Sequence, residues 1–364
     1  MLKHEIVKER ILEDIKKLRP NERIMSRPSM CRKYEFSRTT VDMAVNELVK
    51  EKVLYSIAGS GTYVSAEYRS NMNALSQGVT SWGVILPDLV SDIYPLFIRG
   101  VEDFARLRNI NTVICNTDHD INKQNEHIMR LIDSGIMGII IIPAISRETD
   151  ESGFYKLREK KIPFVFCNRN ISNMPTVPYI YSNDFYGGFI ATKHLIEKNY
   201  KHIAYIAQER YKSSMDRYCG YVGALAESGI KIDRSIVCLE PFDENSKNGD
   251  FSYEFARRIL KSDNPPDAFF CFNDRIALSV YRALRDCNLK VSDDVGLIGY
   301  DNTSICEALE VQLTSVCFKN YELGRHSAKI LYNELQGEKL EGINVFTLQP
   351  ELIIRDSCLG RKLK

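Results

Sequence analysis

The most constraining feature of the sequence is a series of short apolar runs that alternate with amphipathic helices from Trp82 onward. The first runs are SWGVILP, NTVICNTD, MGIIIIPA and IPFVFCN, and helical spacing occupies Leu96–Arg108, Lys123–Ser134 and Phe154–Lys161 between them. Unbroken apolar runs of strand length that are separated by helices are typical of parallel strands buried on both faces. The segment therefore predicts a doubly wound α/β sheet.

A second series of the same kind follows. Helical spacing over Gly187–Lys198, Arg217–Ser228, Ser252–Lys261 and Arg275–Asn288 alternates with the runs HIAYIAQ, SIVCL, AFFCFN and VGLIGYD. Two sheets of similar size in tandem predict a two-lobed domain over residues 81–364. A ligand of such a domain binds in the cleft between the carboxyl ends of the strands.

The N-terminal part has a different pattern, in which three helices precede a hairpin. Apolar residues have helical spacing over 3–18, and serine N-caps at Ser26 and Ser37 start the second and third helices. Two short β-runs, Val53–Ile57 and Thr62–Val64, then enclose a glycine-rich turn. This order predicts a winged helix-turn-helix domain over residues 1–66, and the polar stretch 67–80 is predicted to be a linker.

The third helix carries side chains suited to DNA. A recognition helix enters the major groove by its N-terminal end, where arginine reads guanine or phosphate and hydroxyls donate to base edges or phosphate. Glycine in the wing lets the backbone approach the sugar-phosphate chain. The predicted DNA-contacting residues are Arg27, Ser37, Arg38, Thr39, Thr40, Asp42, Ser60 and Gly61. The alternative is that these residues only cap a helix and close the fold.

Charge and composition narrow the class of protein. Residues 1–66 carry 13 Lys and Arg against 9 Asp and Glu, whereas the whole chain has a net charge of only +1. The charged first 20 residues and the absence of a long apolar stretch argue against export or a membrane span, so a cytoplasmic location is expected. None of the ten cysteines forms a Cys-x-x-Cys pair, and the six histidines form no ligand-spaced cluster. We expect no metal site, no cofactor and no disulfide.

The segment FSRTTVDMAVNELVKEKVLYSIAGSGTYV resembles the GntR-family DNA-binding domain, which implies double-stranded operator DNA as a partner. Two departures stand out. Asp42 occupies a position where the family often has arginine, and Pro28 occupies another, although Arg27 is adjacent. An aspartate repels phosphate unless it accepts a hydrogen bond from a cytosine. An altered operator, an altered affinity and a loss of DNA binding all stay open.

The remaining chain resembles the LacI/GalR effector domain and the periplasmic sugar-binding proteins. The resemblance rests on YSNDFYGGFIATKHLIEKNYKHIAYIA, RYCGYVGAL, PDAFFCFNDRIALSVYRAL and VSDDVGLIGYDN. Together with the head, the chain is most similar to the arabinose-repressor branch. This implies a homodimeric repressor of carbohydrate-utilisation genes that is relieved by a small sugar, with a pentose such as arabinose first.

Chemistry and this resemblance select the ligand-binding candidates. A polyol needs arginine, aspartate and asparagine side chains for its hydroxyls and an aromatic ring against its apolar face. The predicted ligand-binding residues are Arg217, Asn273, Asp301, Asp88, Asp92, Tyr94 and Arg169, with Asn168 as a weaker candidate. Two alternatives stay open: Arg217 and Asp301 form a structural ion pair, or Tyr94 only packs in the core.

Other classes of protein fit less well. Gly187-Gly188 lies near a predicted helix start, but no G-x-G-x-x-G or phosphate-binding loop follows a strand, and no Ser/His/Asp set meets at the strand ends. An enzyme is therefore not expected, and no catalytic residue is predicted. A transport binding protein would share the sensor fold but lack residues 1–66. An activator remains an alternative to a repressor.

Overall fold

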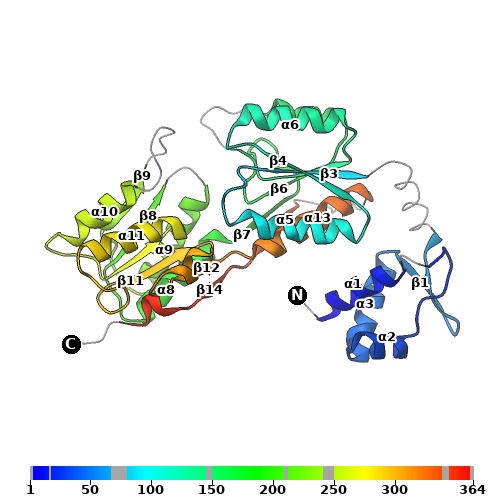
Figure 1. The fold of residues 1–364 in the computed structure, drawn as a ribbon, viewed down its shortest axis with the longest axis horizontal. Helices are drawn as coiled ribbons and strands as arrows, with labels where there is room; N and C mark the ends of the chain where they lie inside the picture. Colours follow the sequence, from blue (N-terminus) through cyan, green and yellow to red (C-terminus); the bar gives the residue numbers. More distant parts are fainter. Residues whose placement is uncertain are drawn as a thin grey trace.

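The computed structural model describes residues 3–15, 18–66, 80–144, 150–208, 212–240, 250–337 and 344–360. They form a small helical head and two α/β lobes (Figure 1). The predicted linker 67–80 lies outside the described residues, apart from Thr80. In these ranges no helix is both long and apolar enough to cross a membrane.

The head has the three helices and the hairpin that the sequence predicts. Its elements are α1 (Lys3–Ile15), α2 (Arg27–Tyr34), α3 (Arg38–Lys50), β1 (Leu54–Ile57) and β2 (Gly61–Val64). The Ser26 hydroxyl accepts a hydrogen bond from the Ser29 N–H, and the Ser37 hydroxyl accepts one from the Thr40 N–H, so both helices begin at their predicted caps. Apolar side chains of the helices and of the hairpin form one separate buried core.

The first lobe is a fully parallel sheet with the strand order β13-β7-β6-β5-β3-β4. Its strands are β3 (Ser81–Leu86), β4 (Asn111–Asn116), β5 (Gly138–Ile141), β6 (Phe164–Cys167), β7 (Tyr179–Ser182) and β13 (Val345–Leu348). Its helices are α5 (Tyr94–Arg106), α6 (Ile121–Asp133), α7 (Ser152–Glu159) and α13 (Asn320–Leu335). Figure 1 shows α5 and α13 side by side on one face of the sheet and α6 on the other.

The second lobe repeats this plan with the strand order β14-β12-β11-β10-β8-β9. Its strands are β8 (Ile203–Gln208), β9 (Val237–Glu240), β10 (Ala268–Cys271), β11 (Gly296–Tyr300), β12 (Thr314–Cys317) and β14 (Glu351–Ile353). Its helices are α8 (Asp184–Glu197), α9 (Lys212–Glu227), α10 (Asp250–Leu260), α11 (Asp274–Asp286) and the short α12 (Ile305–Ala308). Only β14 runs antiparallel to its neighbour, β12.

The chain passes between the lobes three times, after β7, after β12 and after β13. The prediction of two lobes strictly in tandem is wrong in this respect, because α13 and β13 return to the first lobe. The sequence did not reveal β13 because alternate residues of this edge strand are exposed, so it has no continuous apolar run. The three connections bring the ends of the strands of both lobes to one cleft.

One helix boundary differs from the sequence prediction. Helix α9 begins at Lys212 rather than at Arg217, because its first residues are polar and give no apolar spacing. Gly188 of α8 lies at a close contact between two helices. A Cβ there would lie 2.1 Å from the Arg217 carbonyl oxygen, so this glycine lets α8 pack closely against α9.

Candidate functional site

The N-terminal end of α3 presents polar side chains to solvent. Ser37, Arg38 and Thr39 are exposed, and the Arg38 side chain is 79% exposed. The Ser37 hydroxyl also lies 2.8 Å from the Thr40 hydroxyl, which fixes both groups at the first turn. The predicted recognition residues therefore share one accessible helix end, as direct reading of a major groove requires.

The hairpin supports a wing beside this helix. Gly61 has a φ of 137°, which favours glycine, and the exposed Ser60 hydroxyl lies 2.5 Å from the Tyr63 hydroxyl. The side chain of Arg23 lies directly over Gly61, because a Cβ there would meet its Nε at 2.5 Å. Sequence analysis missed Arg23, since only its antiparallel pairing with Tyr63 in the folded head brings it to the wing.

The Asp42 carboxylate forms ion pairs with two arginines on this surface. It lies 2.7 Å from Arg27 Nε and 3.8 Å from Arg38 Nε. Arg27 also donates to the Thr62 hydroxyl, which connects α2, α3 and the wing. The aspartate therefore replaces the usual arginine without leaving an unpaired negative charge, and Arg27 provides the compensating cation.

A polar cavity of about 510 Å³ lies between the two lobes. All seven predicted ligand-binding residues line it: Asp88, Asp92, Tyr94, Arg169, Arg217, Asn273 and Asp301, together with Asn168. The structure therefore brings together every residue that was selected for this role. Whether they bind a ligand stays a prediction.

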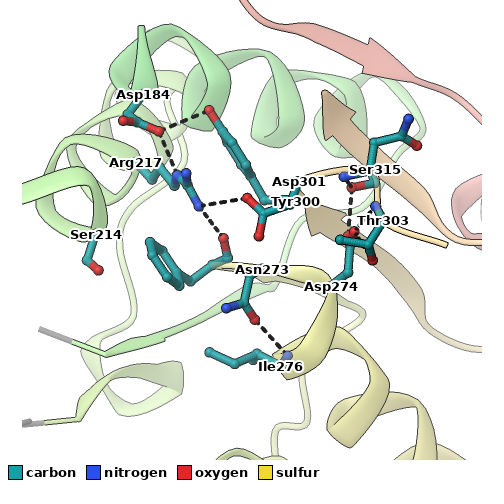
Figure 2. A network of polar contacts seen from close by, with 12 residues as sticks. Asp184, Ser214, Arg217, Asn273, Asp274, Ile276, Tyr300, Asp301, Thr303 and Ser315 are labelled. Atoms are coloured by element: carbon teal, nitrogen blue, oxygen red, sulfur yellow. Dashed lines mark hydrogen bonds and ion pairs between the residues drawn. The ribbon is translucent and has the colours of Figure 1, made fainter. Parts of the chain in front are cut away.

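A buried ion-pair network forms the second-lobe wall of the cleft (Figure 2). Arg217 donates from Nε to Asp184 at 2.8 Å and from Nη1 to the Phe272 carbonyl at 2.6 Å, and Nη1 lies 3.8 Å from Asp301. The Arg217 guanidinium carbon lies 3.4 Å from the centre of the Tyr300 ring. Arg217 is thus held in place mainly by Asp184, with Asp301 as a longer contact, and the alternative of a structural ion pair between Arg217 and Asp301 stays open.

Asp301 and Asn273 keep groups available for hydrogen bonding. Among the described residues, the Asp301 carboxylate has only Arg217 as a partner, and Asn273 uses Oδ1 to cap α11 through the Ile276 N–H. Burial raises the pKa of Asp301 well above its usual value, because the guanidinium of Arg217 offsets only part of the cost of burying its charge. Hydroxyl donors from a ligand would stabilise this carboxylate.

The first lobe provides the opposite wall of the cleft. Asp88 accepts hydrogen bonds from the backbone N–H groups of Val90 and Ser91, and its Oδ2 lies 3.5 Å from Nε2 of His119. Burial alone would raise the pKa of Asp88, but these interactions outweigh it and lower the pKa. Asp88 therefore stays ionised, and its hydrogen bonds fix the orientation of its carboxylate.

Asp92 connects the two walls. Its Oδ2 accepts a 2.5 Å hydrogen bond from the Ser304 hydroxyl of the second lobe.

Sequence analysis missed several residues that line the cavity, namely His119, Phe251, Phe272, Thr303 and Phe318. Phe272 lies within the quoted segment PDAFFCFNDRIALSVYRAL, beside Asn273, but the others come from loops and element ends far apart in the chain and no quoted motif includes them. Within the described residues no group of His, Cys, Asp or Glu has the arrangement of a metal site.

A helix-turn-helix head joined to a two-lobed domain with a polar cleft defines the class of ligand-regulated transcriptional regulators. Family models agree with each half. Residues 3–64 match the bacterial regulatory proteins of the gntR family, and residues 192–358 match the periplasmic binding protein-like domain.

Similar proteins extend the match to nearly the whole chain. The HTH-type transcriptional repressor PurR of Pasteurella multocida is 30% identical over 89% of this chain and 96% of its own length. The arabinose metabolism transcriptional repressor of Geobacillus stearothermophilus is 28% identical over 93% of this chain and 92% of its own. A LacI-family regulator from Enterococcus faecium, solved with bound ribose, is 27% identical with a TM-score of 0.65 and covers 78% of this chain and 100% of that one.

The chain belongs to the LacI/GalR-type transcriptional repressors and carries a GntR-type helix-turn-helix head. These relatives are regulators of transcription and not enzymes.

Proposed function

We propose that this protein is a cytoplasmic, dimeric repressor of carbohydrate-utilisation genes that releases operator DNA when a small neutral sugar binds in the interlobe cleft. Residues 1–66 serve as the DNA-binding domain, 67–80 as the linker and 81–364 as the sugar-binding domain. A dimer is expected because one small head buries little DNA surface and palindromic sites match two-fold proteins. A pentose such as arabinose is the first candidate, since relatives named as arabinose repressors match over most of the chain.

The main support for this proposal is the set of residues that line the interlobe cavity. Asp301, Asp88 and Asn273 line it together with the aromatic residues Tyr94 and Phe318. Acceptors and donors for adjacent hydroxyls, next to aromatic faces, suit a sugar. Its volume of about 510 Å³ is in the range of small-molecule sites.

Charge favours an unphosphorylated sugar. Five aspartates line the cavity against three arginines. Arg217 already pairs with Asp184, and Arg169 donates to the Pro143 carbonyl. Since a phosphate would meet the Asp88 carboxylate, whose pKa is lowered, while two of the three arginines are already engaged, we expect neutral pentoses or hexoses to bind and their phosphates to bind more weakly.

Thermal-shift screening of the full chain with pentoses, hexoses and their phosphates tests the ligand class. A cleft ligand at about 100 times its dissociation constant should add roughly 2.7 kcal/mol of stability. We expect this stabilisation from a neutral sugar. Stabilisation by sugar phosphates alone would contradict the charge argument, and no response to any carbohydrate would contradict the proposed sensor.

An alternative is a repressor-like protein with altered or lost DNA binding, and Asp42 is the residue that distinguishes the two. If Asp42 only neutralises Arg27 and Arg38, Asp42→Asn frees both arginines for phosphate. Binding to a selected operator and to unrelated duplex should tighten alike, and the slope of log affinity against log salt should steepen by about one.

Fluorescence anisotropy at several salt concentrations measures both quantities for Asp42→Asn. Glu13→Gln removes one charge from α1, outside the predicted DNA face, and serves as the matched control. Relaxed preference at a single base pair would show instead that Asp42 reads a cytosine. Identical binding by wild type and variant would place Asp42 away from DNA.

A further inference from the structure

The head lies against the first lobe on the side formed by α5 and α13, opposite α6 (Figure 1). The contact is electrostatic. Arg325 of α13 lies 3.4 Å from Glu5 and 3.0 Å from Glu9 of α1, measured between its terminal nitrogens and their carboxylate oxygens. The Arg325 side chain is only 16% exposed, so this ion pair is partly shielded from water.

The charge pattern of α1 fits this partner. Glu5 and Glu9 are four residues apart, so their like charges face the same side of the helix and repel each other. The planar guanidinium of Arg325 reaches both carboxylates and removes this repulsion. The other acidic residues on this side of the head, Glu47 and Glu51, already pair with Lys8 of α1.

Charge is complementary across the contact. On the lobe side, Arg108, Arg325 and Lys329 line a cavity of about 280 Å³ whose head side includes Glu5 and Glu9. Residues 1–66 carry 13 Lys and Arg against 9 Asp and Glu, and the predicted DNA face includes the exposed Arg38. The face turned toward the lobe is therefore chemically distinct from the predicted DNA face.

Helix α13 packs closely against α5 and begins near the ligand cleft. A Cβ at Gly324 would lie 2.0 Å from the Phe97 carbonyl oxygen of α5, so the two helices are in close backbone contact. Phe318 lines the cleft just before α13 begins at Asn320, and Arg325 lies in the second turn. The contact thus links the orientation of the head to the end of α13 nearest the cleft.

We propose that the acidic face of α1 is a docking surface for α13 of the same chain, with Arg325 bridging Glu5 and Glu9. The predicted recognition end of α3 stays accessible in this arrangement, since Arg38 is 79% exposed. Docking therefore orients the head and does not block its predicted DNA surface. The inference goes beyond the proposed function and does not depend on the identity of the sugar.

Carbodiimide cross-linking of full-length Arg325→Lys tests the contact directly, because this reagent joins only a carboxylate and an amine that are in contact. We expect mass spectrometry to find an amide between the introduced lysine and Glu5 or Glu9, in a product that migrates as a single chain. The yield should fall near 1 M salt, where the Debye length is about 3 Å. Glu5→Gln/Glu9→Gln in the same background should abolish the product.

Arg130→Lys is the matched control, since Arg130 is an exposed arginine of α6 on the opposite side of the lobe. Cross-links from α1 to the lysine of this control at a similar yield would show non-specific collision and overturn the proposal. A failure of Arg325→Lys to link to α1 at low salt would overturn it as well. A linked product found only between two chains would show that the head docks on a second copy, which also contradicts docking within one chain.

Discussion

Asp184→Ala is expected to destabilise the second lobe by about 3–5 kcal/mol, because removing one partner of a buried ion pair leaves the other charge uncompensated. Arg217 is 6% exposed and would lose its carboxylate at 2.8 Å. Asp301 remains, but at 3.8 Å and without a hydrogen bond. Tyr300, whose hydroxyl donates to Asp184, would lose its acceptor too.

Urea unfolding followed by circular dichroism measures this loss. The matched control is Glu227→Ala in α9, which removes an exposed partner of Lys193 and should cost no more than about 1 kcal/mol. Asp184→Ala combined with Arg217→Met removes both charges of the 2.8 Å pair but leaves Asp301 without its cation, so it should recover only part of the lost stability. A single variant as stable as wild type would show that Asp184 does not hold Arg217 in solution.

Asp301→Asn should differ from Asp184→Ala, because we expect it to leave the fold intact and to weaken sugar binding. Arg217 keeps Asp184, so no buried charge is left alone. The ligand loses a carboxylate acceptor, and hydrogen bonds to a charged group are worth about 1.5–3 kcal/mol each. We therefore expect the dissociation constant to rise by at least about tenfold, since 1.4 kcal/mol corresponds to tenfold.

Calorimetric titration with the sugar identified by thermal shift measures the effect of Asp301→Asn, with Glu227→Gln on the exposed side of α9 as the surface control. Unchanged affinity would remove Asp301 from the ligand site. A variant that fails to fold would assign Asp301 a structural role, and the argument from Arg217 and Asp184 would then be wrong.

Much of the fold could be predicted because its signals are local. Ser26 and Ser37 are N-caps that act within one helical turn, and the buried strands β3, β5, β10 and β11 are apolar runs. The return of α13 and β13 to the first lobe could not be predicted in this way. Which lobe an element joins depends on packing between residues more than 100 positions apart, such as the hydrogen bond from Tyr321 to Asp103.

The cleft residues likewise include some that the sequence predicts and others that only the folded chain brings together. Asp301 directly follows β11 and Asn273 lies two residues after the end of β10, so parallel topology alone predicts that they meet. His119 reaches the cavity through a loop in which both Asp118 and His119 have positive φ, and no sequence pattern predicts that conformation for these residues. Asp184, the nearest anion to Arg217, lies 33 positions away in another helix.

The central claim is that a sugar in the cleft controls how tightly the head binds DNA. The most direct test measures the affinity of the full chain for a duplex selected from a random library, with and without the sugar at saturation. Differential affinity for the two states of the cleft should give a coupling of about 1–3 kcal/mol, so the sugar should weaken operator binding by about 5–150-fold. Operator affinity that is unchanged or increased, with a sugar that demonstrably stabilises the protein under the same conditions, would contradict the account.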